Sequence, residues 1–244
     1  MRGYNSGRSR VKYLRTEEIE RSALGLLGAY ARQFSTVIAP PVPVEEILES
    51  HLELDLRFED LPALLDKPDA LGATWVRRRK VGMDQSLDPT LYPARKGRYR
   101  FTVGHETGHW VLHRNLFLAR AYQTSLFGDD DQPSVVCRAG GGADPLEWQA
   151  NQFAAYLLMP TDLVFEAWDR ERGSRDPYVA AEEIAELSDR WGLEEDETPT
   201  VGIARALAEI FAVSGQAMQI RLVGMGLIRT RPVAPGLFDA RTVR

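Results

Sequence analysis

The sequence predicts an α+β fold, in which a small β-sheet in the N-terminal half packs against a mainly helical core with additional C-terminal helices. Two patterns predict it. Apolar and polar residues alternate, as in short strands, between residues 54 and 85, and apolar residues at helical spacing dominate after residue 101. With 244 residues and 44% hydrophobic content, the chain can bury a core without disulfides.

The N-terminal half is predicted to contain two helices and three strands. Thr16 suits the N-cap of the first helix, and the proline-rich segment 40–43 ends its pattern, because proline cannot continue a helix. A basic run, 77–80, lies between or along the last two strands. The expected elements are a helix from Thr16 to about Phe34, a short helix at 44–51, a strand at 54–58 and two strands within 71–85.

The rest of the chain is predicted to be helical. A polar segment from about 122 to 145, which contains the acidic cluster Asp129–Asp131, separates the first two helices. A connection of this length inside a compact domain is usually functional or disordered. The expected helices lie at 101–118, 146–158, 161–170 and 178–191, with two short ones after Pro199 and Ser214.

Charge and cysteine content exclude several classes of protein. The net charge of −5 argues against a coat of nucleic acid, so direct nucleic-acid binding is not expected. The one cysteine, Cys137, excludes an internal disulfide framework, and no apolar run has the form of a membrane span or a secretory signal. We therefore expect a cytoplasmic protein without a membrane partner.

The sequence His105-Glu106-Thr107-Gly108-His109 has the spacing of a metal clamp. Residues four apart lie one turn apart on the same face of a helix, so His105 and His109 can direct their imidazoles at one ion. Glu106 is rotated by about 100° from His105, which leaves it beside the ion as a general base. Zinc lowers the pKa of the water it binds to roughly 7, so each position has a chemical role.

The alternative is a helix whose histidines are merely packed or solvated. Apolar residues such as Val103, Trp110 and Leu112 surround the motif and predict that the helix is buried. Two adjacent buried imidazoles and a carboxylate need compensation, which a metal ion supplies. The flanking residues therefore favour the metal.

A catalytic zinc has three protein ligands, so a third one is needed. Glu147 is the best candidate, because it falls on the apolar face of its helix, three residues before Ala150. Asn151, one turn further along, can hydrogen-bond a ligand from behind. The competing explanation is a glutamate favoured by the helix dipole in a first turn, with Asp144 as the cap.

Three other residues or clusters are weaker candidates for the third ligand. His113 would lie about 12 Å along the helix axis from His105, too far to share one ion, and is expected to support the site, face the substrate or serve the fold. The cluster Asp129–Asp131 has the character of a solvated surface. A lone cysteine such as Cys137 can bind zinc as a thiolate but is more often a small packing residue.

A family resemblance is carried by residues 40–47, 100–113 and 147–160 and, more weakly, by 213–228. These stretches resemble the ImmA/IrrE family of bacterial and phage metallopeptidases. The resemblance implies a zincin-like core and a gluzincin-like ligand set, with zinc held by His105, His109 and Glu147 and with Glu106 as general base. It also implies a task, which is to cut or inactivate a DNA-binding repressor, often encoded next door, and so to switch on stress, phage or mobile-element genes.

Two features depart from the family pattern. Tyr156 stands where the family commonly has an acidic residue. It can alter the helix surface near the site or donate a phenolic hydrogen bond to an oxyanion, and both roles remain open. No helix-turn-helix module precedes the proline-rich segment, so any DNA binding has to come from a partner or from the C-terminal helices.

The chain is expected to divide into four parts. The parts are a basic, disordered tail at 1–15, a zinc metallopeptidase domain at 16–170, a C-terminal helical region with a helix-turn-helix-like stretch at 171–230, and a tail at 231–244. Within the metallopeptidase domain, the loop at 122–145 is expected to overhang the active-site cleft and limit access to it.

The leading functional hypothesis is a zinc-dependent endopeptidase that cuts a specific protein, a helix-turn-helix repressor encoded nearby. A rival is a zinc-containing DNA-binding or sensor regulator without proteolysis, suggested by the stretch 211–228, which has few basic residues beyond Arg221. A third is a toxin–antitoxin component with the same site. Specificity needs a docking surface, for which the candidates are the run 77–80, next to what could be an edge strand, and the C-terminal helices.

Overall fold

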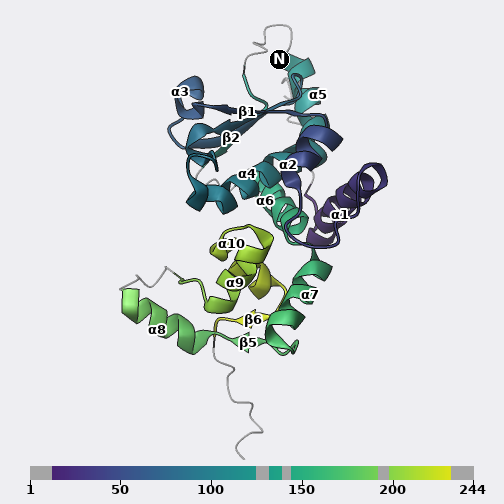
Figure 1. Ribbon diagram of the computed structural model, residues 1–244. Coiled ribbons are helices and arrows are strands. Elements are labelled where there is room, and N and C mark those ends of the chain that lie inside the picture. Colours follow the sequence, from purple (N-terminus) through teal and green to yellow (C-terminus); the bar gives the residue numbers. More distant parts are fainter. Residues whose placement is uncertain (1–12, 125–131, 139–143, 192–197, 232–244) are drawn as a thin grey trace, which may run out of the picture. The chain divides into compact units, whose positions relative to one another are not determined.

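Figure 1 shows the computed structural model of the chain. Its fold is α+β, as the sequence predicts, with a four-stranded mixed sheet in the N-terminal half and helices in most of the rest. None of the described helices has the length and the apolar content that a membrane span needs. The structure describes residues 13–124, 132–138, 144–191 and 198–231.

The chain forms two compact units. Unit 1 contains Met1–Leu163 and Phe211–Val213, and unit 2 contains Val164–Ile210 and Ser214–Arg244. The boundary after Leu163 falls inside helix α7 (Thr161–Arg172). The sequence predicts this boundary seven residues later, after residue 170. Three expected features lie outside the described residues: most of the basic tail, at 1–12, the acidic cluster at 129–131, and nearly all of the C-terminal tail, at 232–244.

The sheet of unit 1 has the strand order β1-β3-β2-β4, so β1 and β4 are its edge strands. β1 (Asp55–Glu59) pairs parallel with β3 (Lys80–Asp84). β2 (Ala70–Trp75) pairs antiparallel with β3 on one side and with β4 (Val135–Arg138) on the other. The three strands expected before the motif are therefore present.

One expectation about this sheet is wrong. β4 lies inside the segment 122–145, which the sequence predicts to be a loop, because four residues give no clear alternation and pairing with β2 is what stabilises them. The basic run 77–80 joins β2 to β3 and, as expected, lies next to an edge strand: Lys80 is the register partner of Asp55 in β1, and the amide of Asp55 donates to the backbone oxygen of Arg79. Arg79 donates to the backbone oxygen of Leu52 at 2.6 Å, and Lys80 pairs with a glutamate of β1 at 2.7 Å.

The side chains of β2 alternate between two faces of the sheet. Ala73 and Trp75 pack with Leu61 of α3 (Leu61–Leu65) in an apolar cluster. Gly72 and Thr74 lie on the opposite face, against α4 (Lys96–Gly108). One face of the sheet therefore supports the core, and the other lines the helix that carries the motif.

A long helical stretch carries the motif. α4 continues through a π-helical turn, η4 (His109–His113), into α5 (Arg114–Thr124). The stretch begins before the expected helix at 101–118 and ends after it. A π-turn holds an extra residue and redirects the side chains that follow it, and such turns are frequent at functional sites.

Helix α6 (Pro145–Leu158) packs closely against α4. A Cβ atom on Gly108 would lie 3.1 Å from the Cα of Ala150, and one on Gly104 would lie 3.3 Å from the Cβ of Ala154. Glycine permits this close approach, because it has no side chain to separate the two helices. The helix with the two histidines and the helix with Glu147 are thus held side by side.

Two further helical segments of unit 1 precede the sheet in the chain. α1 (Thr16–Gln33) packs against α6, and its N-cap is Arg15 rather than the expected Thr16. The short helix expected at 44–51 consists of α2 (Val44–Glu46) and a π-helical turn, η1 (Ile47–His51).

Unit 2 combines helices with a small parallel sheet. The helix expected at 178–191 is shorter, because its first two residues form β5 (Tyr178–Val179), which pairs with β6 (Ile228–Arg229). The helix-turn-helix-like stretch contains two helices joined by a turn at 212–214. The helices that follow β5 are α8 (Ala181–Trp191), α9 (Gly202–Phe211) and α10 (Gly215–Gly224).

Candidate metal centre

The three side chains that the sequence predicts as metal ligands converge between α4 and α6. The Nε2 atoms of His105 and His109 lie 3.0 Å apart. Glu147, in the first turn of α6, reaches both imidazoles: its Oε2 lies 3.2 Å from Nε2 of His105, and its Oε1 lies 3.2 Å from Nε2 of His109. Both histidines are buried, so these three groups share one enclosed position.

The second ring nitrogen of His105 fixes the proton on that imidazole. Nδ1 of His105 lies 2.8 Å from the amide oxygen Oδ1 of Asn151. An amide oxygen can only accept a hydrogen bond, so Nδ1 carries the hydrogen and is the donor. The neutral imidazole therefore presents a lone pair on Nε2, the atom that faces His109 and Glu147.

His109 is oriented by a longer chain of contacts. Nε2 of His113 lies 3.1 Å from Oε1 of Gln149 and donates to it, which leaves Nδ1 of His113 as an acceptor. Nδ1 of His109 lies 3.1 Å from that acceptor and donates to it. The Nε2 atom of His109 therefore also carries a lone pair. Gln149 completes this chain and was not among the predicted site residues.

The residues present fit a metal ion. Two imidazole lone pairs and a carboxylate meet within 3.2 Å, and such electron pairs need a cation between them. Burial acts to raise the pKa of Glu147, but protons on Nε2 of His105 and His109 would donate to this carboxylate and lower its pKa to about 2, and a metal ion takes the place of those protons. Burial lowers the pKa of His109 to about 4, which keeps its imidazole neutral.

Acidic side chains surround the imidazole of His105. Burial opposes a charge on this imidazole, while Cys137, Glu147 and Glu106 together raise its pKa well above the usual value. The pocket therefore attracts positive charge. A metal ion supplies that charge in place of a proton.

Glu106 lies beside these ligands and is completely buried. Its Oε2 accepts a hydrogen bond from Oγ1 of Thr74 at 2.6 Å, while Oε1 has no hydrogen-bond partner among the described residues. Burial raises the pKa of Glu106 to about 7. A carboxyl group with this pKa can exchange a proton near neutral pH.

Gly72 leaves the space that Glu106 occupies. A Cβ atom at this position would lie 2.6 Å from Oε1 of Glu106 and 2.9 Å from Cγ2 of Thr102. β2 therefore supplies both a hydrogen bond and a gap for the same carboxylate. The sequence did not predict either residue, because Thr74 is 32 residues from Glu106 and the fold alone brings them together.

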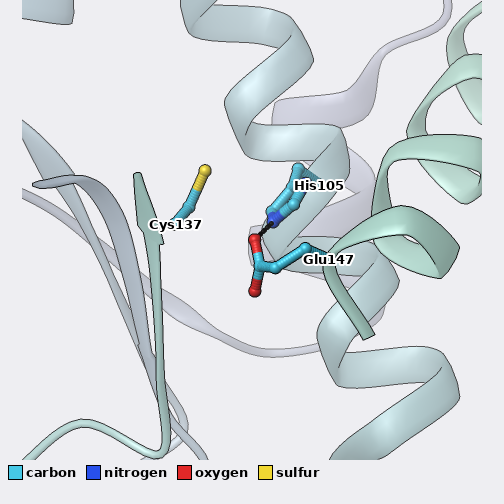
Figure 2. Close-up of side chains that lie close together, drawn as sticks. All are labelled: His105, Cys137 and Glu147. Carbon is cyan, nitrogen blue, oxygen red and sulfur yellow. Dashed lines mark ion pairs between the residues drawn. The ribbon is translucent and has the colours of Figure 1, made fainter. Parts of the chain in front are cut away.

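A sulfur atom from β4 joins the cluster, as Figure 2 shows. Sγ of Cys137 and one ligand atom each of His105 and Glu147 all lie within 4.8 Å of one another, and this group could hold a metal ion. The sequence favours a packing role for Cys137. Its place beside the ligands could not be predicted, because it depends on the unexpected strand β4.

Tyr156 is not part of this group. It is buried farther along α6, about 13 Å along the helix axis from Glu147. The cluster Asp129–Asp131 lies outside the described residues, as does much of the loop that is expected to overhang the site.

Neither a protein-family model nor a curated protein matches the chain. The assignment of the site therefore rests on its own geometry. His105, His109 and Glu147 surround one position, and Glu106 and Cys137 lie beside it.

Proposed function

We propose that the protein is a zinc-dependent endopeptidase that hydrolyses a peptide bond in one specific protein. The observation that carries this proposal is the convergence of His105, His109 and Glu147 within 3.2 Å, with the buried carboxylate of Glu106 nearby. Two imidazoles and a glutamate are a ligand set of catalytic zinc in peptidases. Such sites keep a further position for water or substrate.

His105, His109 and Glu147 would hold the ion. Asn151 and His113 keep the two imidazoles in the tautomers that metal binding needs. Nitrogen donors suit zinc better than magnesium or calcium, which prefer oxygen. Zinc supplies Lewis acidity, which makes water more acidic and a peptide carbonyl more electrophilic.

Glu106 is the general base of the proposed reaction. It takes a proton from the attacking water as the new C–O bond forms at the peptide carbonyl, and it gives a proton to the amide nitrogen as the C–N bond breaks. Thr74 holds one oxygen of this carboxylate. Burial raises the pKa of this carboxylate, which strengthens it as a base.

The proposed substrate is a helix-turn-helix repressor encoded nearby, and the outcome is control of stress, phage or mobile-element genes. The resemblance to the ImmA/IrrE family supports this choice. The one cysteine suits a reducing cytoplasm, where an unrestricted peptidase would degrade the proteins around it. One side-chain pocket discriminates by only about 1–3 kcal/mol, so the substrate has to dock through a further surface.

The test compares wild type with Glu106→Gln on the regulator encoded beside the gene. Glutamine cannot take the proton from water, so we expect unchanged zinc binding and a cleavage rate at least about 100-fold lower. Mass spectrometry follows the products. Glu17→Gln, an exposed change on α1, is the matched control. Cleavage at the native rate by Glu106→Gln would exclude Glu106 as the base.

A second candidate is a DNA-binding regulator that keeps zinc for structure, and the short turn between α9 and α10 favours it. The exposed residues of α10 include Gln216, Ile220 and Val223, which carry no positive charge. Contacts with phosphates need Lys or Arg, so the peptidase is better supported. A gel-shift assay with DNA upstream of the gene separates the two, and the neighbouring genes distinguish a toxin–antitoxin role.

A further inference from the structure

The place of Cys137 in the sheet directs its side chain toward the candidate metal site. It lies opposite Gly72 in the antiparallel pairing of β4 with β2, and such partners project to the same face. This is the face on which Gly72 lies against Glu106. Val136, the preceding residue, projects to the other face and packs with the cluster around Leu61.

The surroundings of Cys137 are those of a ligand. Zinc binds sulfur at about 2.3 Å and nitrogen at about 2.1 Å, so two such donors to one tetrahedral ion lie about 3.6 Å apart. The sulfur of Cys137 already lies within 4.8 Å of ligand atoms of His105 and Glu147. A side-chain movement of about 1 Å brings the sulfur to an ion that His105 and Glu147 hold.

We propose that Cys137 is a fourth protein ligand of the zinc ion and that it closes the site in the resting protein. The thiol releases its proton to solvent when it binds. A tetrahedral ion with four protein ligands has no position left for water or substrate. The closing of the site rests on the proposed function: the resting protein is a latent peptidase that becomes active when Cys137 leaves the ion.

The strand that carries Cys137 allows this release. β4 is an edge strand that pairs with β2 alone in the described sheet. The other three ligands lie on α4, η4 and α6, which pack against one another. Movement of β4 can therefore open the fourth position while His105, His109 and Glu147 stay in place.

Cobalt(II) tests the ligation directly, because a cobalt–thiolate bond gives a near-ultraviolet charge-transfer band that imidazole and carboxylate ligands do not give. Cys137 is the only cysteine of the chain, so the band has one source. We expect this band in the wild-type cobalt protein and its loss in Cys137→Ala and Cys137→Ser, which should still bind one cobalt ion. A wild-type cobalt protein without the band would overturn the proposal.

The reactivity of the thiol gives a second readout. We expect a disulfide reagent to modify Cys137 at least about tenfold more slowly in the zinc protein than in the metal-free protein, because ligation occupies the thiolate. Glu106→Gln leaves all four ligands intact and should show the same protection. Equal rates with and without zinc would mean that burial alone protects the thiol, and the proposal would fail.

Cleavage of a confirmed regulator tests the closing of the site. Cys137→Ala should cleave it at least about tenfold faster than wild type, because the fourth position is then open. If the wild-type cobalt protein shows the thiolate band while Cys137→Ala cleaves the regulator at the wild-type rate, the claim that Cys137 closes the site is refuted, although Cys137 remains a ligand. If no variant cleaves any regulator, the proposed function fails, and the cobalt band still decides whether Cys137 is a ligand.

Discussion

Glu106 depends on two residues of a neighbouring strand for its position. Thr74 donates a hydrogen bond of 2.6 Å to one carboxylate oxygen, and Gly72 leaves room for the other. A fully buried carboxylate without these neighbours would lose its partner or its space. The reactivity that we assign to Glu106 is therefore a property of β2 as much as of the motif.

We expect Gly72→Ala to lower the hydrolysis rate at least about tenfold while zinc stays bound, because displacement of a catalytic group by even 1 Å is costly. The added Cβ would lie 2.6 Å from Oε1 of Glu106, so the carboxylate has to move. Initial rates and zinc content check this. In the control Gly82→Ala, the Cβ would meet Trp75 at 3.0 Å and Leu61 at 3.2 Å on the other face, so only stability should fall. If Gly72→Ala and Gly82→Ala lowered the hydrolysis rate per folded molecule equally, Gly72 would have no special role in positioning Glu106.

At the scale of elements, the crossing of α4 and α6 sets the geometry of the ligands. Gly108 lies next to His109 in sequence, and its partner Ala150 lies three residues after Glu147. The separation of the two helices at this point therefore controls how far the carboxylate is from the imidazoles. A wider crossing would pull Glu147 away from both histidines.

We expect Gly108→Ala to lower both the melting temperature and the zinc affinity, the latter at least about tenfold. Alanine favours a helix by about 1 kcal/mol over glycine, but overpacking costs about 1–3 kcal/mol. The cost of overpacking should exceed the gain in helix propensity, because the added Cβ would lie 3.1 Å from both the Cα and the carbonyl oxygen of Ala150. Thermal denaturation and zinc titration measure the two effects.

Gly25→Ala on α1 is the matched control, because its added Cβ meets nothing within 4 Å, so this variant should be more stable than wild type. A stabilised Gly108→Ala with native zinc affinity would contradict the importance of the close crossing.

The helices and the strands differ in how far the sequence predicted them. His105 and His109 lie four apart on one helix, and the apolar face of α6 directs Glu147 inward, so local periodicity was enough to propose all three as ligands. β4 was missed because its four residues give no clear period and depend on β2. The places of Thr74 and Cys137 beside the motif follow from strand pairing between distant residues, which local patterns do not contain.

At the scale of the whole molecule, a docking surface has to supply specificity. The basic run 77–80 is partly engaged within unit 1, because Arg79 and Lys80 make the hydrogen bonds described above and also lie over tryptophan rings. Charge reversal at these two residues would disturb the fold. A docking test can change Arg77 and Arg78, whose side chains are exposed in the turn between β2 and β3.

We expect the zinc-loaded protein to leave casein intact while it cleaves or tightly binds the neighbouring regulator. Reversal of Arg77 and Arg78 to glutamate should weaken regulator binding about tenfold, and the same change at exposed Arg32 should not. Gel analysis of casein and binding titrations check these outcomes. Efficient digestion of casein would contradict narrow specificity. Unchanged binding of the regulator by the variant with Arg77 and Arg78 reversed would show that these residues are not part of the docking surface.

The zinc content of the purified protein tests the central claim most directly, namely that His105, His109 and Glu147 form one zinc site. Wild type, Glu147→Ala and the exposed control Glu17→Ala are titrated with zinc against a competing chelator and then analysed by elemental mass spectrometry. We expect one tightly held zinc ion per chain in wild type and in the control. Affinity should be at least about tenfold weaker in Glu147→Ala, because the carboxylate that reaches both imidazoles is gone. A wild-type chain that takes up no zinc, or a Glu147→Ala variant with native affinity, would contradict the account.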